Sequence, residues 1–188
     1  GSKVIDAPGP DLRGLFTGSE GTLGIVTEMT VQIIPLPESV VTMVAIFDSV
    51  REACEAVSAI IRRGVIPVAL EMLDQEIIKI VEPRVNAGYP LDAGAVLLIE
   101  VEGLKDSVDT DSQLVSDACN DSGAREVRVA ETEDEREKLW EGRKGAIGAI
   151  GAAYPAYYLL DGVVPRTKLP QVMEDVLEVA RSYGFRCA

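Results

Sequence analysis

The chain has 188 residues, with 18 Lys and Arg against 31 Asp and Glu, a formal net charge of −13 and no histidine. The lack of histidine excludes Ser-His-Asp and Cys-His nucleophile systems, His-containing zinc sites and imidazole bases within these residues. Because no cluster of Lys and Arg offsets the acidic balance, nucleic acid and anionic membranes are poor partners. Chemistry in this chain must therefore rest on carboxylates, Arg, Lys, Tyr or a cofactor.

The composition fits a globular chain of one domain, or of one domain with part of another. Hydrophobic residues make up 47% of it, and no apolar run approaches the roughly 20 residues that a membrane helix needs. The N-terminus has no secretory signal pattern. We therefore expect a cytoplasmic protein with no membrane span and no metal site. An odd number of widely spaced cysteines indicates reduced thiols that serve as small apolar side chains: Cys54, Cys119 and Cys187.

The first part of the chain, residues 1–21, is rich in Gly, Pro, Asp and Ser and is predicted to be an irregular loop. From Thr22 to Ile34 apolar and polar residues alternate, as in a half-buried strand. Pro35-Leu36-Pro37 follows directly, and prolines cannot donate hydrogen bonds to a neighbouring strand. The sequence therefore predicts a strand from Thr22 to Ile34 and a linker after it.

Two stretches after the linker repeat one order of elements, strand, helix, strand. Ser49 and Glu52 form the capping-box pattern that starts the first of these helices. The repeat favours a ferredoxin-like split β-α-β fold of the α+β class, with an antiparallel sheet and helices on one face. An α+β arrangement of another kind stays open. The predicted elements are strand 41–47, a helix from Ser49 to Arg63, strand 67–73, a short helix 75–81, strand 93–101, helix 106–122 and strand 125–130.

A second capping-box pattern, Thr132 with Glu135, predicts the start of another helix. This helix should fray or bend where glycines recur, at Gly145, Gly148 and Gly151, because each costs up to ~1 kcal/mol relative to Ala. We further expect a strand over 157–163, a helix over 170–183 and the first residues of a strand over 184–188. The sequence would then stop inside an element, so we expect an excised fragment of a longer protein.

The segment from Leu15 to Glu28 is the most informative part of the sequence. Glycines at 18, 21 and 24 allow the backbone to approach a ligand closely, and exposed N–H groups of such a loop suit phosphate or ring-carbonyl oxygens. The spacing matches neither the Rossmann fingerprint nor the P-loop. From spacing alone, a plain turn before a strand is the favoured interpretation, and a ligand loop is the alternative.

The residues of this segment nevertheless resemble a known family. The string from Asp11 to Ile25, DLRGLFTGSEGTLGI, resembles the flavin-binding segment of the FAD-linked oxidase family, which includes glycolate oxidase and D-lactate dehydrogenases. The resemblance covers essentially the whole chain. Further matches are Ile66-Pro67, Leu70-Glu71-Met72, Ala87-Gly88-Tyr89-Pro90, Trp140, Gly142-Arg143-Lys144, Tyr157-Tyr158, Asp161-Gly162 and Pro165-Arg166.

The resemblance implies an FAD-dependent enzyme that oxidises a small 2-hydroxy acid of the glycolate or D-lactate type. Residues 1–38 would be the C-terminal remnant of the FAD-binding domain, and 39–188 the truncated cap or substrate domain. Arg143 would bind the substrate carboxylate, since a guanidinium is a charged, two-pronged donor; a surface arginine paired with Glu137 or Glu141 is the alternative. The residues expected to contact FAD are Gly18, Ser19, Glu20, Gly21, Thr22, Leu23, Gly24 and Ile25.

The family's pyrophosphate loop would precede residue 1, and its His-x-Gly-Asp-Gly-Asn motif would follow Ala188. By this resemblance, the chain alone is expected to bind no FAD and to oxidise nothing. The implied partners are a 2-hydroxy acid, other oxidase subunits including an iron-sulfur subunit, and further copies of the chain. The alternative is a free-standing ferredoxin-like module that binds a small molecule or another protein chain without redox activity.

Overall fold

The computed structural model describes residues 9–188, so residues 1–8 of the proposed FAD-domain remnant lie outside the described part. The chain divides into two compact units, Gly1–Leu36 and Pro37–Ala188.

Within residues 9–36, the first unit contains one short helix, α1 (Leu12–Phe16), where the sequence predicted only loop. Its start is capped by Asp11, whose Oδ1 accepts a hydrogen bond from Gly14 N at 2.9 Å. The strand predicted from Thr22 to Ile34 is wrong: residues 22–34 form no strand, and Ile25 and Ile33 are 86% and 88% exposed. A strand is stable only when paired, and residues 9–36 contain no second strand for it.

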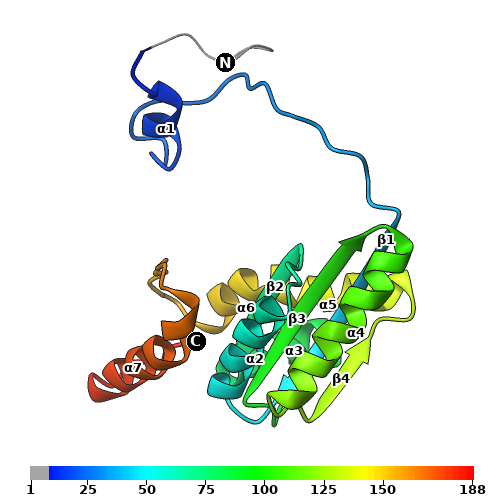
Figure 1. Cartoon of the computed structure of the whole chain (residues 1–188). Helices are drawn as coiled ribbons and strands as arrows, with labels where there is room; N and C mark the ends of the chain where they lie inside the picture. Colours follow the sequence, from blue (N-terminus) through cyan, green and yellow to red (C-terminus); the bar gives the residue numbers. More distant parts are fainter. Residues whose placement is uncertain (1–8) are drawn as a thin grey trace. The chain divides into compact units, whose positions relative to one another are not determined.

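The second unit is built on a four-stranded antiparallel sheet with strand order β2-β3-β1-β4 (Figure 1). The two central strands pair along their whole length, from Ser39↔Gly103 to Phe47↔Ala95. Helices connect β1 to β2 and β3 to β4, which confirms the predicted ferredoxin-like arrangement. The strands are β1 (Ser39–Phe47), β2 (Ala69–Asp74), β3 (Ala95–Gly103) and β4 (Glu126–Val129).

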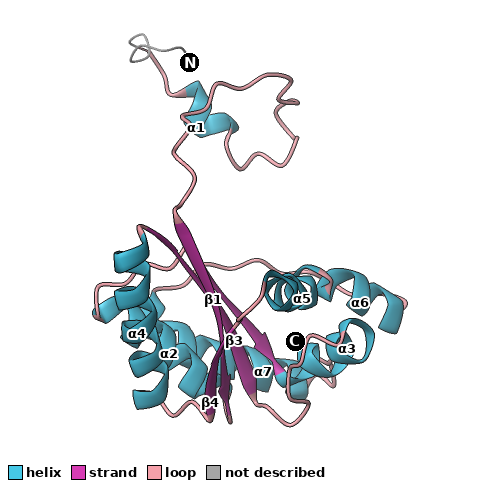
Figure 2. Cartoon of the chain, turned by 90° about the vertical axis from the view of Figure 1, so that its right-hand side faces the viewer, coloured by secondary structure: helices cyan, strands magenta, loops and turns pink. Residues whose placement is uncertain are grey.

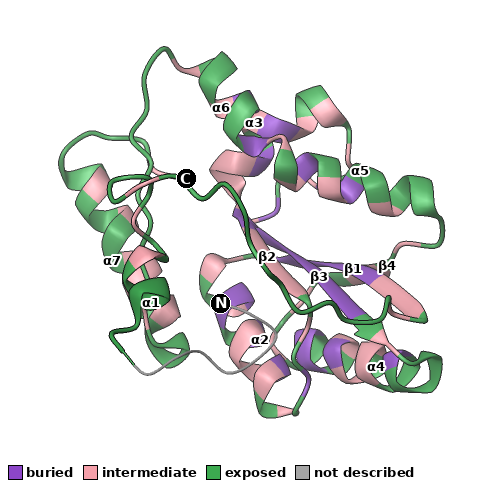
Figure 3. Ribbon diagram, turned by 90° about the horizontal axis from the view of Figure 1, so that it is seen from above, coloured by how far each residue is buried: buried purple, intermediate pink, exposed green. Residues whose placement is uncertain are grey.

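Helices cover both faces of the sheet, not one face as predicted (Figure 2). The reason lies in the central strands, where successive side chains are buried on opposite faces, so each face needs a cover. Figure 3 shows these buried residues on β1 and β3 and on the helix sides that face them. On one face lie α2 (Val50–Arg62) and α4 (Lys105–Asp121), and on the other α3 (Gln75–Val85), α5 (Glu133–Lys144) and α6 (Ala146–Ala153).

The helix starts follow the capping patterns of the sequence. At α2 the capping box is complete, because Glu52 N donates to Ser49 Oγ at 3.2 Å and Ser49 N donates to Glu52 Oε2 at 3.0 Å. At α5 only half of the box forms: Glu135 N donates to Thr132 Oγ1, whereas the Glu135 carboxylate accepts from Glu131 N. The predicted interruption is confirmed at Gly145, where α5 ends and α6 begins, but not at Gly148 and Gly151, which lie inside α6.

The last part of the chain forms a 3₁₀ turn, η1 (Arg166–Lys168), and helix α7 (Leu169–Ser182), close to the predicted helix. The strands predicted over 157–163 and 184–188 are wrong, because neither segment pairs with a strand of the described sheet. Helix α7 is tied to α2 by two hydrogen bonds from Arg51 to the Glu174 carboxylate, at 2.8 and 2.5 Å.

All three cysteines are free, with Cys54 and Cys119 buried, and burial raises the pKa of the Cys54 thiol to about 11.

Candidate functional site

The glycine-rich segment of the first unit is a compact turn. Both the N–H and the hydroxyl of Thr22 donate to the carbonyl of Ser19, at 2.9 and 2.6 Å. Gly18, Glu20 and Gly21 have positive φ values of 80°, 50° and 79°, a region that glycine enters without cost. All eight residues predicted to contact FAD therefore lie on one continuous turn and the stretch that leaves it.

This turn leaves backbone donors available. Within residues 9–188, the exposed N–H groups of Gly18, Glu20 and Gly21 meet no protein acceptor. A Cβ at Gly18 or Gly21 would meet nothing within 4 Å, so a ligand could approach the backbone there. Neutral N–H donors at a glycine-rich turn suit phosphate and ring-carbonyl oxygens, the groups that FAD carries. The donor set therefore fits this cofactor.

Arg143, the residue predicted to bind the substrate carboxylate, lies near the end of α5 and faces the sheet. Its Nε donates a hydrogen bond to Oε2 of Glu71 on β2 at 2.8 Å, and the two side chains are 39% and 37% exposed. The partner is thus neither Glu137 nor Glu141, the two that sequence spacing suggested. Within residues 9–188, Nη1 and Nη2 of Arg143 donate no hydrogen bond to protein.

A buried carboxylate anchors the same helix. Glu100 on β3 is 8% exposed and accepts hydrogen bonds from Thr42 Oγ1 at 2.6 Å, Trp140 Nε1 at 2.8 Å and Arg136 Nε at 3.0 Å. Burial acts to raise the pKa of Glu100, but the hydrogen bonds from Arg136, Thr42 and Trp140 outweigh it, and the pKa lies below its ordinary value. Glu100 is therefore an ionised structural anchor with its acceptor sites in use.

A second contact fixes α5 just before Arg143. The hydroxyl of buried Tyr89 donates to the carbonyl of Leu139 at 2.5 Å, and burial raises the pKa of this hydroxyl. The ring lies so close to Gly142 that a Cβ there would be 2.6 Å from Tyr89 Cε2. Glycine at 142 is therefore required for this approach of Tyr89 to the helix.

The sequence offered a weak signal for these anchors. Glu100 interrupts the apolar run of β3, and a charged residue in a buried strand is usually paired. Glu71 lay inside the Leu70-Glu71-Met72 match to the family, but nothing in the sequence linked it to Arg143. Together, Glu71, Glu100 and Tyr89 hold a half-exposed arginine on a fixed helix, an arrangement suited to binding a carboxylate.

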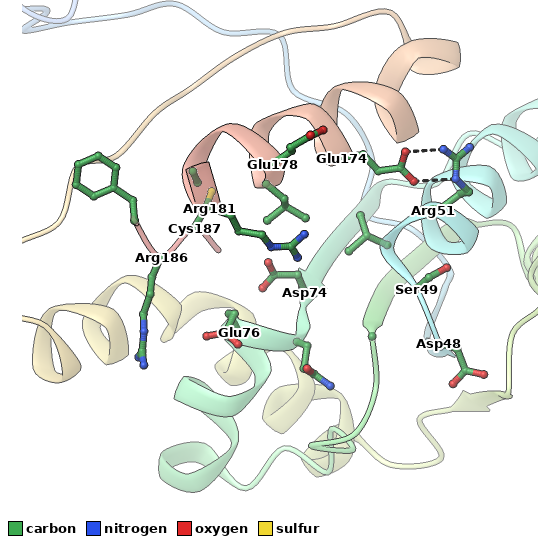
Figure 4. A pocket seen from close by; sticks show the side chains of 16 residues that line it. Asp48, Ser49, Arg51, Asp74, Glu76, Glu174, Glu178, Arg181, Arg186 and Cys187 are labelled. Carbon is green, nitrogen blue, oxygen red and sulfur yellow. Dashed lines mark hydrogen bonds and ion pairs between the residues drawn. The ribbon is translucent and has the colours of Figure 1, made fainter. Parts of the chain in front are cut away.

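Apart from these two regions, a groove lined by charged residues lies between α7 and the starts of α2 and α3 (Figure 4). Figure 4 shows Asp74, Glu76 and Arg181 around it, with the Arg51–Glu174 pair at one end.

Residues 9–188 contain no group of three or more Asp, Glu or Cys side chains placed to hold a metal ion. Across the same residues, no helix has the length and apolar character needed to cross a membrane.

Comparison with known families matches residues 36–188 to the model described as FAD linked oxidases, C-terminal domain. The chain belongs to the FAD-linked oxidase family. Glycolate oxidase subunit GlcD of Escherichia coli (strain K12) is 45% identical to it over 188 residues, all of this chain and 38% of that protein. GlcD of Bacillus subtilis (strain 168) is 38% identical over 185 residues, which are 98% of this chain and 39% of that protein.

A more distant relative within the family is the probable mitochondrial D-lactate dehydrogenase of Danio rerio, 34% identical over 169 residues, 89% of this chain and 34% of that protein. Among solved structures, alkyldihydroxyacetonephosphate synthase superposes with a TM-score of 0.65 at 20% identity, over 93% of this chain and 37% of that one. At that identity the likeness concerns the fold alone. The chain thus spans less than two-fifths of the length of these relatives.

Proposed function

We propose that the chain is part of an FAD-dependent oxidoreductase that oxidises a small 2-hydroxy acid of the glycolate or D-lactate type. The observation that carries this proposal is the 45% identity to a glycolate oxidase subunit, in an alignment that covers the whole chain. The second relative type, a D-lactate dehydrogenase, is named for a substrate of the same class. Both substrates are short acids with one carboxylate and a hydroxyl on C2.

We assign residues 1–38 to the end of an FAD-binding domain and residues 39–188 to a cap domain that faces the substrate. In the first region, the turn from Gly18 to Ile25 would contribute backbone donors to the oxygen atoms of FAD. FAD, when bound, would supply the two-electron acceptor that oxidation of a 2-hydroxy acid to a 2-oxo acid requires. The remainder of the FAD site would come from other parts of the full-length protein.

In the second region, Arg143 would bind the substrate carboxylate. Its Nη1 and Nη2 are the nitrogens with no acceptor within residues 9–188, and they can donate two parallel hydrogen bonds to one carboxylate. Such a pair holds the substrate at its C1 end and so fixes the direction of C2. No other arginine on the described part of α5 has both Nη groups available.

Substitution of Arg143 by Met in the full-length protein tests this assignment. We expect the KM for glycolate and D-lactate to rise at least about tenfold, or turnover to be lost, because charge-assisted hydrogen bonds worth about 1.5–3 kcal/mol are removed. Lys144→Met is the matched control, since it removes the adjacent cation, which lies over the Trp140 ring. Unchanged kinetics of Arg143→Met would refute the carboxylate-binding role.

The 188-residue chain alone is proposed to bind no FAD and to oxidise no 2-hydroxy acid, since the relatives are more than twice its length. Purified chain should be colourless, without the visible absorbance of a flavin; a yellow preparation would contradict this.

We also propose a cytoplasmic location for the full-length protein. We further propose that it associates with other oxidase subunits, an iron-sulfur subunit among them, because two of its relatives are named as subunits.

A further inference from the structure

Two carboxylates on one face of the sheet each hold an arginine of α5. Glu100 on β3 and Glu71 on β2 point to the same face, because Glu100 is paired with Ala69 and side chains two apart on a strand share a face. Arg136 and Arg143 are seven residues apart on the helix, and so also share a face. Glu100 binds Arg136, and Glu71 binds Arg143.

The two pairs differ in how many donors they use. All three nitrogens of the Arg136 guanidinium donate to carboxylates: Nε and Nη2 to Glu100 at 3.0 and 3.3 Å, and Nη1 to Glu133 at 2.7 Å. Arg143 donates to Glu71 through Nε alone, at 2.8 Å. Each nitrogen of the Arg136 guanidinium is thereby engaged, whereas Nη1 and Nη2 of Arg143 donate to no protein acceptor within residues 9–188, and its side chain is 39% exposed.

The backbone beneath Arg143 is already fixed. The Glu100 contacts hold Arg136 and Trp140, and the Tyr89 hydroxyl and ring hold Leu139 and Gly142. What remains free is the rotation of the Arg143 side chain itself, a long side chain with many accessible rotamers. A hydrogen bond to Nε restricts that rotation without occupying the end of the guanidinium.

We propose that Glu71 is the positioning residue of Arg143: it holds Nε so that Nη1 and Nη2 are directed at the substrate carboxylate. This inference rests on the proposed function of Arg143. Glu71 itself does not contact the substrate, and it is neither the acid nor the base of the reaction. It lowers the entropy that the arginine loses when substrate binds, and so it contributes to substrate affinity more than to the hydride-transfer step.

The experiment uses the full-length flavoprotein and two readouts. Steady-state kinetics with glycolate give KM and kcat, and the change of flavin absorbance on titration with oxamate gives a dissociation constant for a monocarboxylate that has no hydrogen on C2. We expect Glu71→Ala to raise both the KM and the oxamate dissociation constant about tenfold, because the Arg143 side chain, no longer held at Nε, loses more conformational entropy when it binds the carboxylate. The kcat should change by less than about threefold, because Arg143 still reaches the bound substrate.

Two further variants separate positioning from charge and from folding. Glu71→Gln should stay within about threefold of the wild type, because its amide oxygen still accepts from Nε. Glu71→Asp, whose carboxylate is withdrawn by one methylene, should lie between wild type and Glu71→Ala, and it carries the test if Glu71→Ala fails to fold. Glu141→Ala removes an exposed carboxylate two residues from Arg143 and should leave both constants unchanged.

The double variant Glu71→Ala/Arg143→Met should bind oxamate no more weakly than Arg143→Met, because Glu71 acts only through Arg143. Additive losses would overturn the positioning role. So would unchanged or tighter binding in Glu71→Ala alongside weak binding in Arg143→Met, and then the role of Arg143 would stand without that of Glu71. Normal binding in Arg143→Met would instead overturn the proposed function of Arg143 itself.

Discussion

The two faces of the sheet in the second unit differ in chemistry. Under α2 and α4 the buried core of the face is apolar, and its strand residues include Met43, Ala45, Phe47, Leu97 and Ile99, each fully buried. Under α3 and α5 the face is apolar at one end, with Val44, Ile46, Val96 and Leu98, and polar at the other, with Thr42, Glu71 and Glu100.

The difference indicates a separate role for each face. The apolar face needs only volume and shape, and it gains stability from burial of area. The mixed face gives up part of that gain, because a buried carboxylate roughly breaks even with an apolar core at best. In return it fixes where α5 lies and which way its arginines point, which an apolar contact specifies less sharply. The candidate carboxylate-binding residue, Arg143, is on this mixed face.

Substitution of Glu100 by Ala tests the cost of the polar end. It leaves the indole N–H of Trp140, the hydroxyl of Thr42 and the Arg136 guanidinium without their shared acceptor. We expect the free energy of unfolding to fall by about 1.5–3 kcal/mol, the range for hydrogen bonds to a charged group. Chemical denaturation followed by Trp140 fluorescence measures it. A loss below about 0.5 kcal/mol would mean that the mixed face is held by its apolar end alone.

The pH dependence provides the control for this prediction. The pKa of Glu100 in the folded protein lies below its ordinary value of 4.5, so its stabilising effect is present above that value and is lost as the pH falls through the folded pKa. Glu100→Gln does not titrate, and the stability difference between wild type and Glu100→Gln should shrink as the pH is lowered below 4.5. A constant difference would show that the charge of Glu100 has no role.

How much of the fold is predictable from sequence is clearest from two segments with strand-like patterns. Most of Ser39–Phe47 was predicted as a strand and is the centre of the sheet, whereas the prediction for Thr22–Ile34 failed. Alternation specifies which side chains share a face, but a strand also needs a partner, and β1 has two, β3 and β4. The pairing partners lie far along the chain and leave no local signal.

The candidate site shows the same limit. The turn around Gly21 and the position of Arg143 came from resemblance to a family, and the sequence suggested only helical neighbours, Glu137 or Glu141, as partners for the arginine. The actual partner, Glu71, is 72 residues away in sequence. The contact between Arg143 and Glu71 depends on the order of the strands and on the position of α5 relative to β2. The side-chain pattern of one local segment encodes neither of these.

The smallest expected effects come from two glycines on the helices of the mixed face. Gly142→Ala places a Cβ 2.6 Å from Tyr89 Cε2 and 3.2 Å from Ala87 Cβ, so the ring must move. We expect a loss of about 1–2 kcal/mol, overpacking partly offset by the better helix propensity of Ala. Gly148→Ala on α6 meets nothing within 4 Å and should instead gain up to about 1 kcal/mol.

Thermal unfolding of the two variants beside the wild type gives both signs in one experiment. If Gly142→Ala were as stable as Gly148→Ala, the close approach of Tyr89 to α5 would not be part of what holds the helix. If Gly142→Ala is destabilised and also weakens carboxylate binding in the full-length protein, the Tyr89 contact is coupled to the position of Arg143. The mixed face would then act as one unit, from the buried ring of Tyr89 to the partly exposed side chain of Arg143.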